Sequence, residues 1–335
     1  MRAVVTGDTH LNAKPYKAVE SFYGLWQAFQ IAQARNLPLV HLGDMFDSTR
    51  PSSSTCSVLQ RVARNFDSTK IFYILGNHDK TDNPWQETIL KNAEHLPSNV
   101  GLDYTSEPDE VIRFIKTSAC PVVCVHAFIG DILPSSTIPI ESISPSPTVL
   151  SGHFHVPCQI EAPGAKVVYV GSSHQVVKFR EPEASFIAHP TNNKRVLVVD
   201  FETGEMEGIE LQTRQYVTVI ALEDIKVPDT IGEPVSLPPA LSILTGVKAL
   251  RPFVRVVYSD KYTPADVHDL FDERLTILET MPAPVSKKAV DSEFWSLEDV
   301  LCEYLPAGDA RSFVESLVQN PEDAVSDLRK QFEVD

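Results

Sequence analysis

The amino-acid sequence predicts an α/β fold built on a largely parallel sheet. In the amino-terminal part, short apolar runs alternate with segments whose apolar residues recur at helical spacing. Five of the apolar runs end in Asp, Asn or His. Alternating strands and helices favour parallel pairing, and the carboxyl ends of parallel strands form the edge at which such sheets bind ligands. We therefore expect polar side chains that are far apart in the sequence to meet at one place.

The elements of this part follow one another in the order that the fold requires. Strands are predicted at residues 2–8, 37–44, 71–79, 121–128 and 147–155, and helices at residues 16–35 and 52–66. Apolar residues at helical spacing mark the two helices: Val19, Phe22, Trp26 and Phe29 in the first, and Leu59, Val62 and Phe66 in the second.

The pattern changes after residue 167. Residues 167–177 and 195–211 have the pattern of strands, with a turn at Thr203-Gly204, and they provide strands for a second sheet packed on the first. Residues 232–242 are rich in Pro and Ser and resemble a linker. Residues 253–259 and 264–278 then predict a strand and a helix of a small α/β unit. Amphipathic helices are predicted beyond Ser296, which forms a capping pair with Asp299.

Composition indicates an ordinary soluble protein with room for two domains or one large domain with an appendage. The chain has 335 residues, of which 43% are hydrophobic and 22% are charged. It has no apolar run of about eighteen residues and no apolar signal-peptide core, so we expect no membrane span. The scattered cysteines fit a reducing cytoplasm, the host cytoplasm if the chain is of phage origin, and argue against a thiolate metal site: Cys56, Cys120, Cys124, Cys158 and Cys302.

The net charge of −16 at pH 7 constrains the partners of the chain. A DNA-binding protein that acts alone usually carries a basic stripe, whereas residues 251–335 hold 18 acidic and 9 basic residues. If the substrate is nucleic acid, bound metal ions or a partner subunit must offset the repulsion.

The strand ends supply a mixture of oxygen and imidazole ligands. They carry Asp8, His10, Asp44, Asp47, Asn77, His78, Asp79, His126, His153 and His155. This mixture suits Mn, Fe, Zn or Mg, and it is large enough for two ions that share a bridging carboxylate. Helix capping is the structural alternative, but it explains Asp8 or Asn77 singly and does not explain the whole set.

The polar blocks resemble the signature of the calcineurin-like metallophosphoesterases. The blocks D-x-H, G-D-x-x-D, G-N-H-D, a lone His and G-H-x-H occur in this order, at residues 8–10, 43–47, 76–79, 126 and 152–155. The resemblance implies a two-sheet metallophosphoesterase sandwich flanked by helices.

Within that superfamily the chain resembles the SbcD family of nuclease subunits and its bacteriophage recombination-nuclease counterparts. Residues 168–181 are similar to the Y-x-G-S…F-x-E segment of that family. The resemblance implies three domains: a nuclease domain at 1–212, a small α/β capping domain at 213–285, and C-terminal helices at 286–335 that dock a partner ATPase.

The resemblance also implies a role for each motif residue. One metal ion would be held by Asp8, His10, Asp44 and His155, and the other by Asp44, Asn77, His126 and His153. The ions are expected to be Mn²⁺, with Mg²⁺ as the alternative. His78 would contact the phosphate or protonate the leaving oxygen, Asp79 would orient His78, and Asp47 would fix a ligand histidine.

The implied function is a DNA exonuclease and endonuclease subunit for recombination, repair and replication. Its expected partners are DNA, an SbcC-like coiled-coil ATPase, and a second copy that pairs through the helices around Trp26 and Leu59. Two alternatives stay open: a stand-alone phosphoesterase for nucleotides or phosphoproteins, and a non-catalytic scaffold. Candidate phosphate contacts are Lys14, Lys17, Arg50, Lys80, Lys178 and Arg180, with a solvated surface as the alternative. Structural roles are expected for His41, His95, His189 and His268, and a role near the substrate is the alternative for His174.

Overall fold

The computed structural model describes residues 1–11, 15–81, 85–130, 138–174, 193–221, 232–259, 261–271 and 276–282. By contacts the chain divides into two compact units. The first comprises Met1–Thr218, Pro228–Val254 and Asp272–Leu278, and the second comprises Val219–Val227, Arg255–Phe271 and Glu279–Asp335. The predicted boundaries at residues 213 and 286 stay predictions, and the predicted C-terminal helices lie outside the described residues.

The first sheet has six strands in the order β10-β9-β1-β2-β3-β4. Its strands are β1 (Arg2–Thr6), β2 (Leu39–Leu42), β3 (Ile71–Ile74), β4 (Ala93–His95), β9 (Arg195–Asp200) and β10 (Met206–Glu210). Strands β1 to β4 pair in parallel, whereas β9 runs antiparallel to both β1 and β10. Residues 195–211, expected in a second sheet, therefore extend the first sheet.

The second sheet has four strands in the order β5-β6-β8-β7. They are β5 (Val122–His126), β6 (Thr148–Gly152), β7 (Cys158–Ala162) and β8 (Ala165–Tyr169). Strands β5, β6 and β8 are parallel, and β7 is the antiparallel edge strand. The carboxyl ends of β5 and β6 are the ends at which two of the predicted motifs follow.

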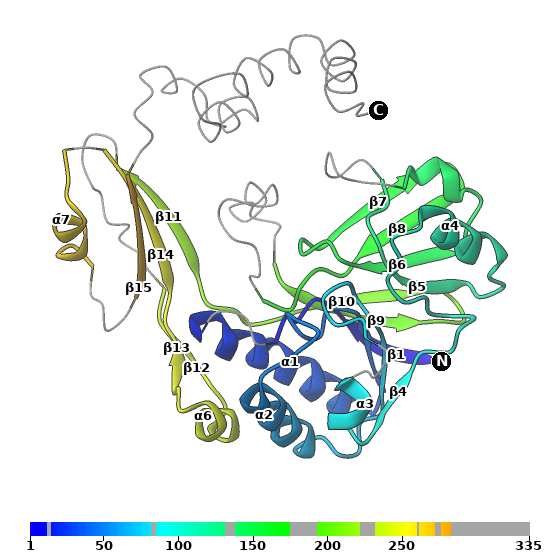
Figure 1. Cartoon of the computed structure of the whole chain (residues 1–335), viewed down its shortest axis with the longest axis horizontal. Helices are drawn as coiled ribbons and strands as arrows, with labels where there is room; N and C mark the ends of the chain where they lie inside the picture. Colours follow the sequence, from blue (N-terminus) through cyan, green and yellow to red (C-terminus); the bar gives the residue numbers. More distant parts are fainter. Residues whose placement is uncertain are drawn as a thin grey trace, which may run out of the picture. The chain divides into compact units, whose positions relative to one another are not determined.

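The two sheets pack face to face, with helices on their outer faces (Figure 1). Strand side chains alternate between faces, so Val5 packs against Leu150 and Val122 between the sheets, whereas Val4 packs outward. Helices α1 (Pro15–Arg35), α2 (Ser53–Arg64) and α3 (Trp85–Ile89) cover the first sheet. Helix α4 (Pro108–Thr117) and the 3₁₀ helix η1 (Ile140–Ile143) cover the second. The sandwich is therefore a four-layer α/β/β/α arrangement, as the resemblance implied.

Helix α1 is tied to the segment that follows β10 by a buried ion pair. Arg214 Nε lies 2.9 Å from Glu20 Oε2, and both side chains are almost fully buried. The hydroxyl of Tyr216 donates to the same Glu20 oxygen at 2.6 Å. A buried carboxylate requires such partners, so these contacts fix α1 against the chain that leaves the sandwich.

The predicted linker at residues 232–242 is structured. It contains β12 (Val235–Ser236), which pairs with β13 (Ala249–Leu250), and the start of α6 (Pro239–Thr245). Leu237 and Leu241 are buried in the core that α1 and α2 share. The proline-rich composition of residues 232–242 therefore did not indicate that this segment packs in the core.

The remaining described elements form a three-stranded sheet and one short helix. The strands are β11 (Tyr216–Ala221), β14 (Phe253–Tyr258) and β15 (Ile277–Pro282), in the order β11-β14-β15. Helix α7 (Pro264–His268) starts at a capping box of Thr263 and Asp266, but it is much shorter than the predicted helix at 264–278. The β-branched pair Thr276-Ile277 leads instead into β15, as β propensity favours.

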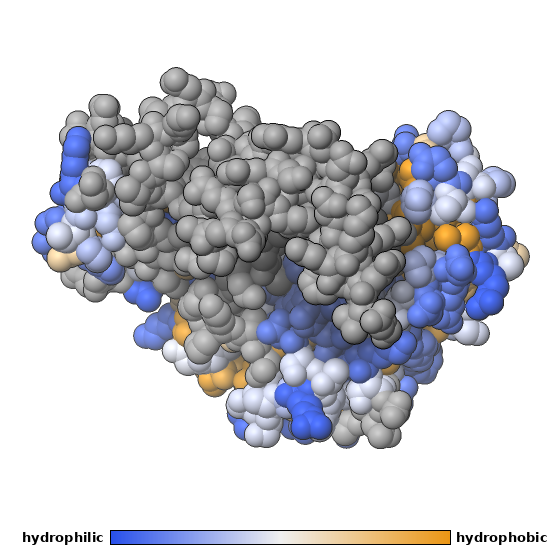
Figure 2. Space-filling model, turned by 45° about the horizontal axis from the view of Figure 1, so that its top comes forward, coloured by the Kyte–Doolittle hydropathy of each residue, from blue (hydrophilic) through white to orange (hydrophobic). Residues whose placement is uncertain are grey.

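The surface of the described residues offers no large apolar area. Figure 2 shows one face on which the described residues are mostly hydrophilic, with smaller hydrophobic areas between them. Among the described residues, the exposed large hydrophobic side chains are Met1, Ile243 and Leu270. None of the helices in the described ranges has both the length and the hydropathy that a membrane crossing requires.

Candidate metal centre

Strand ends bring the predicted motif residues together. Asp8 and Asp44 each lie two residues beyond the end of a parallel strand, and Asn77 lies three residues beyond β3. His126 is the last residue of β5, and His153 follows β6 directly. The first two loops are joined by backbone hydrogen bonds, from Asp8 N to the Gly43 carbonyl and from His10 N to the Asp44 carbonyl, both at 3.0 Å.

Several of these residues have strained backbones. Asp8, His10, Asp44 and His153 have φ values of 49°, 42°, 51° and 79°, in the left-handed region that non-glycine residues rarely adopt. Such a conformation costs about 1–3 kcal/mol per residue and persists where the surrounding structure enforces it, often at functional sites. In these backbone conformations the side chains of the strand-end loops point towards one another.

The first candidate ligand group consists of Asp8, His10 and His155. His10 Nε2 and His155 Nε2 lie 3.1 Å apart. The Asp8 carboxylate accepts hydrogen bonds from the backbone N–H of His153 at 3.0 and 3.2 Å. These contacts hold one carboxylate and two imidazole nitrogens within ligand distance of a single ion.

The second candidate ligand group consists of Asp44, His126 and His153. His126 donates through Nδ1 to the Leu42 carbonyl at 2.8 Å, which turns its Nε2 towards the group. His126 Nε2 lies 3.3 Å from Asp44 Oδ2 and 3.1 Å from Asn77 Oδ1. A backbone carbonyl that fixes the other ring nitrogen is the usual arrangement for a ligand histidine.

Asp44 lies between the two groups. Its Oδ2 is 3.7 Å from His10 Nε2 in addition to its contact with His126, and Asp44 also forms a third group with His10 and His78. Its Oδ1 accepts the backbone N–H of His78 at 2.8 Å. One carboxylate therefore faces both ligand groups, as a bridging ligand would.

Burial and neighbouring charge together set the ionisation of these groups. Burial alone would raise the pKa of Asp44, but the adjacent His126 and His10 and the His78 amide hold this pKa well below its usual range. Burial raises the pKa of Asp8. Burial also lowers the pKa of His153 to about 3, so its ring is neutral, which is the form that binds metals. Burial alone would lower the pKa of His126, but the adjacent Asp44 and Asp8 carboxylates raise it to about 9. Buried carboxylates and imidazoles crowded in this way fit a pair of divalent cations.

Asp47, in the loop after β2, contacts two of the motif histidines. Asp47 Oδ1 lies 3.1 Å from His10 Nδ1, the geometry expected of a carboxylate that orients a ligand ring. The carbonyl oxygen of Asp47 lies 3.1 Å from His78 Nδ1. Unlike the ligand residues, His78 is exposed to solvent. One residue therefore positions both a candidate ligand and the exposed histidine beside it.

Asp79 has different partners from those expected. Its carboxylate accepts the backbone N–H groups of Gly76 and Met45 and the side-chain amide of Gln86, each at 2.7 Å. Burial raises its pKa to about 7. The expectation that Asp79 orients the His78 ring is therefore replaced by a structural role, in which Asp79 joins the loops after β2 and β3. In a tight turn, neighbouring side chains point in different directions.

The motif glycines are required because atoms of neighbouring loops lie very close to them. A Cβ at Gly76 would overlap the Asp44 carboxylate and backbone. A Cβ at Gly152 would overlap the Leu42 carbonyl oxygen and His126 Nδ1. Only glycine lets these loops approach closely enough to assemble the two ligand groups.

Two aromatic residues beside the second group were not identified from the sequence. The Phe128 ring lies 4.1 Å from the His153 ring, and the Tyr104 ring lies 5.9 Å from it, between ring centroids. Neither residue belongs to a motif. Phe128 follows His126 by two residues, so strand alternation is a signal that would have placed it beside this histidine.

The other predicted residues are distributed around the site. His174 and His41 are fully buried and belong to none of the ligand groups among the described residues. Exposed His95 pairs with Asp103 at 2.9 Å. Lys80 is exposed and donates to the Tyr104 carbonyl at 2.7 Å, and Arg50 is also exposed. The candidate phosphate contacts and histidine that lie outside the described residues are Lys14, Lys178, Arg180 and His189, and the Lys17 side chain is likewise not described.

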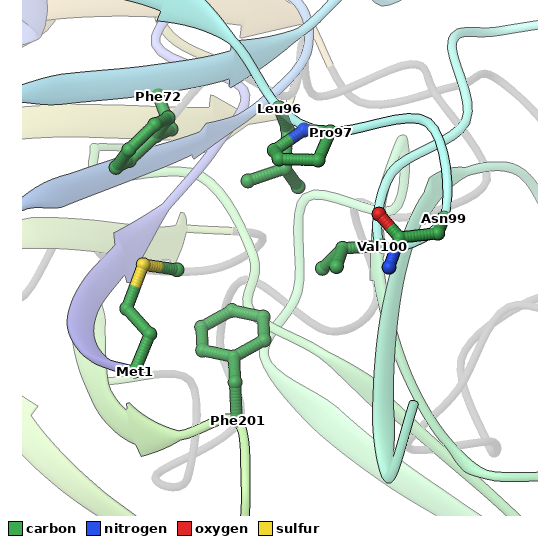
Figure 3. A pocket seen from close by; sticks show the side chains of 7 residues that line it. All are labelled: Met1, Phe72, Leu96, Pro97, Asn99, Val100 and Phe201. Carbon is green, nitrogen blue, oxygen red and sulfur yellow. The ribbon is translucent and has the colours of Figure 1, made fainter. Parts of the chain in front are cut away.

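An apolar pocket of about 300 Å³ lies at the other end of the strands (Figure 3). Met1, Phe72, Leu96, Pro97, Val100 and Phe201 line it, with Asn99 at one side. It is near the start of β1, whereas the motif residues follow the end of that strand. Its lining side chains are apolar apart from Asn99, and none of them belongs to the candidate ligand groups.

Comparison with known proteins identifies the class of this site. The profile of the calcineurin-like phosphoesterase family matches residues 1–157, which contain all five motif blocks. Over these residues the chain is a calcineurin-like metallophosphoesterase. Clusters of His and Asp such as those described above are typical of its dimetal sites.

Within the family the chain is a distant homologue of Mre11. It is 29% identical over 280 residues to the DNA double-strand break repair protein Mre11 of Haloferax volcanii. The similarity covers 71% of this chain and 63% of that protein, so the chain spans less than two thirds of the length of this relative.

Solved structures show weaker likenesses. An archaeal phosphodiesterase has a TM-score of 0.34 and 15% identity, covering 63% of this chain and 100% of that chain. The Pseudomonas putida nuclease MPE has a TM-score of 0.34 and 16% identity, covering 62% and 87%. TM-scores this low carry no weight for function.

Proposed function

We propose that the chain is a metal-dependent DNA nuclease that hydrolyses phosphodiester bonds as an exonuclease and endonuclease in recombination and repair. One observation carries the proposal: Asp44 lies between two groups of His and Asp ligands and contacts a histidine of each, and exposed His78 adjoins them. The similarity to a DNA double-strand break repair protein supports DNA as the substrate class.

In this proposal each ligand group holds one divalent cation, Mn²⁺ or alternatively Mg²⁺. Asp8, His10, Asp44 and His155 hold the first, and Asp44, Asn77, His126 and His153 hold the second. When bound, such a pair of ions polarises the phosphodiester and lowers the pKa of a water between them. The role of the protein is to fix the ligand rings, through Asp47 on His10 and the Leu42 carbonyl on His126.

His78 acts on the departing oxygen. Its Nδ1 faces the Asp47 carbonyl, so this nitrogen donates and Nε2 remains for the substrate. Its backbone N–H is fixed by Asp44. In the protonated ring, Nε2 donates to the phosphate or gives its proton to the leaving oxygen. Asp79 contributes indirectly, by joining the two loops that carry Asp44 and His78.

The experiment is DNA degradation by the purified full chain with Mn²⁺. End-labelled duplex DNA should be shortened from its end, and His78→Ala should abolish this without lowering the melting temperature. His95→Ala is the matched control, because His95 is an exposed histidine outside the ligand groups, and it should retain activity. Hydrolysis of nucleotide monoesters without cleavage of DNA would instead identify a stand-alone phosphoesterase.

The proposed complex adds an SbcC-like coiled-coil ATPase and a second copy of the chain. The net charge of −16 supports a partner that supplies much of the DNA affinity. The amphipathic sequence beyond Ser296 is the proposed docking segment. Capture of the ATPase should be lost when residues beyond 296 are deleted, and retained capture would refute the docking proposal.

A further inference from the structure

Lys194 is a buried lysine at the start of β9. Its residue is only 3% exposed. Lysine is almost never fully buried unless its ammonium group has hydrogen-bond partners, because desolvating the charge is costly. The partners of such a lysine therefore indicate what it is for.

The Lys194 ammonium group contacts the backbone of a candidate metal ligand. Nζ donates to the carbonyl oxygen of His155 at 2.7 Å and to Ser172 Oγ at 3.0 Å. The backbone N–H of Ser172 donates to the same His155 carbonyl at 3.1 Å. The Ser172 hydroxyl in turn donates to the His174 carbonyl at 2.6 Å. The His155 carbonyl is thus held by two residues.

These contacts connect the two sheets at the edge where the strand ends carry the candidate metal ligands. Lys194 precedes β9 of the first sheet, whereas His155 follows β6 of the second. Ser172 forms an isolated parallel bridge with Gly7, the residue before Asp8. The contacts therefore connect the loop that carries His155 with the strand end that carries Asp8.

The direction of the His155 imidazole follows from these contacts to its carbonyl oxygen. Its Nε2 lies 3.1 Å from His10 Nε2, within the group that also contains Asp8. A carbonyl fixed in place limits the rotation of the His155 backbone, and the ring direction follows from that backbone.

We infer that Lys194 is a positioning residue for the ion held by Asp8, His10, Asp44 and His155. The inference rests on the proposed function for its two ions. Loss of an outer partner of a metal ligand typically lowers metal affinity about 10- to 100-fold. Lys194→Met, which keeps the length and removes the donors, therefore weakens binding of this ion by that factor and leaves the ion at His126 and His153 unchanged.

The direction of the change in Mn²⁺ affinity distinguishes a positioning role of Lys194 from an effect of its charge. A buried ammonium near a cation repels it, so removal of the charge alone would strengthen metal binding. Weaker binding in Lys194→Met therefore reports the lost hydrogen bonds. Lys166→Met is the matched control, since Lys166 is a half-buried lysine of β8 paired only loosely with Glu161 at 3.9 Å.

The test is a Mn²⁺ titration of the metal-free full chain by calorimetry and by the electron paramagnetic resonance of bound manganese. His155→Ala marks which binding step belongs to the first ion. We expect Lys194→Met to weaken that step alone, Lys194→Met with His155→Ala to add no further loss, and Lys166→Met to match the wild type. Ser172→Ala removes the hydroxyl group that accepts from Lys194 and leaves Lys194 in place. It should therefore weaken binding of the first ion, but less than Lys194→Met does.

Three results would overturn the positioning role: unchanged or tighter Mn²⁺ binding in Lys194→Met, equal weakening of both steps, or unchanged binding in Ser172→Ala. The Ser172→Ala measurement decides the question if Lys194→Met does not fold. A wild-type chain that binds no Mn²⁺ would refute the proposed two-ion function itself, which is a different outcome from a titration in which the wild type binds and the variants do not differ.

Discussion

Asp44 is the residue that contacts histidines of both ligand groups. Its Oδ2 faces His126 at 3.3 Å and His10 at 3.7 Å, while its Oδ1 fixes the His78 backbone. Asp8, by contrast, belongs to one group only. The two aspartates are equally buried, yet they differ in how many ligand groups each one contacts.

Asp44→Asn and Asp8→Asn should therefore have different effects. Each change keeps the side-chain volume and removes the charge. Asp44→Asn should lose both Mn²⁺ ions, and cleavage of DNA should fall about 1,000-fold or more, because the charge stabilisation that the ions supply is worth several kcal/mol.

Asp8→Asn should lose one ion and retain the other. The bound manganese per chain, measured by mass spectrometry after gel filtration, checks both outcomes. Two ions retained in Asp44→Asn would contradict the bridging role of this carboxylate.

At the scale of the elements, local sequence patterns predicted the strands that carry the site. Each of these strands is an apolar run with a polar end, and both features lie within a few residues. The prediction that residues 195–211 belong to a second sheet was wrong, because β9 pairs with β1 and β10 pairs with β9. This pairing joins residues about two hundred positions apart, as between Arg2 and Asp200, so a local sequence pattern does not specify it. The linker prediction failed because the packing of Leu237 and Leu241 is likewise a tertiary effect.

Residues that act through the backbone were the hardest to predict. The motifs identify candidate ligand side chains, and the structure brings these together at one edge. Lys194 acts on a carbonyl, and Asp79 acts on backbone N–H groups. A carbonyl or an amide is the same at every position of a sequence, so no residue pattern marks such a contact.

The ion pair of Glu20 and Arg214 gives the prediction for helix α1. Arg214→Met leaves a carboxylate buried beside Tyr216, and loss of one partner of a buried pair costs about 3–5 kcal/mol. Arg214→Met combined with Glu20→Gln removes the charge as well, so this double variant should be more stable than Arg214→Met alone. Urea denaturation of each variant measures these free energies of unfolding.

The exposed pair of Arg35 and Glu207 is the control for that comparison. Both side chains are well exposed, although the guanidinium makes two bonds of 2.7 Å to the carboxylate. Arg35→Met should leave the free energy of unfolding nearly unchanged, because solvent screens the pair. If the double variant were as unstable as Arg214→Met, the buried charge would not be the cause.

At the scale of the whole molecule, the net charge of −16 complicates any measurement of metal binding. Divalent cations gather around an acidic surface without a specific site and reduce its self-repulsion. Bound ions at the candidate centre should act differently, since they bind the folded chain and not the unfolded one. The two effects can be separated, because only the second depends on the ligand groups.

Mn²⁺ should therefore raise the melting temperature of the wild-type chain by several degrees, and chelation should reverse the rise. At a free concentration 100-fold above the dissociation constant, one bound ion stabilises the fold by about 2.7 kcal/mol. The measurement is a thermal melt at constant ionic strength, with and without Mn²⁺. Asp44→Asn changes a net charge of −16 by one, so surface condensation of cations should be nearly the same in both chains. A loss of the rise in Asp44→Asn would assign it to the centre, whereas an equal rise in both chains would assign it to the acidic surface and contradict the two-ion site.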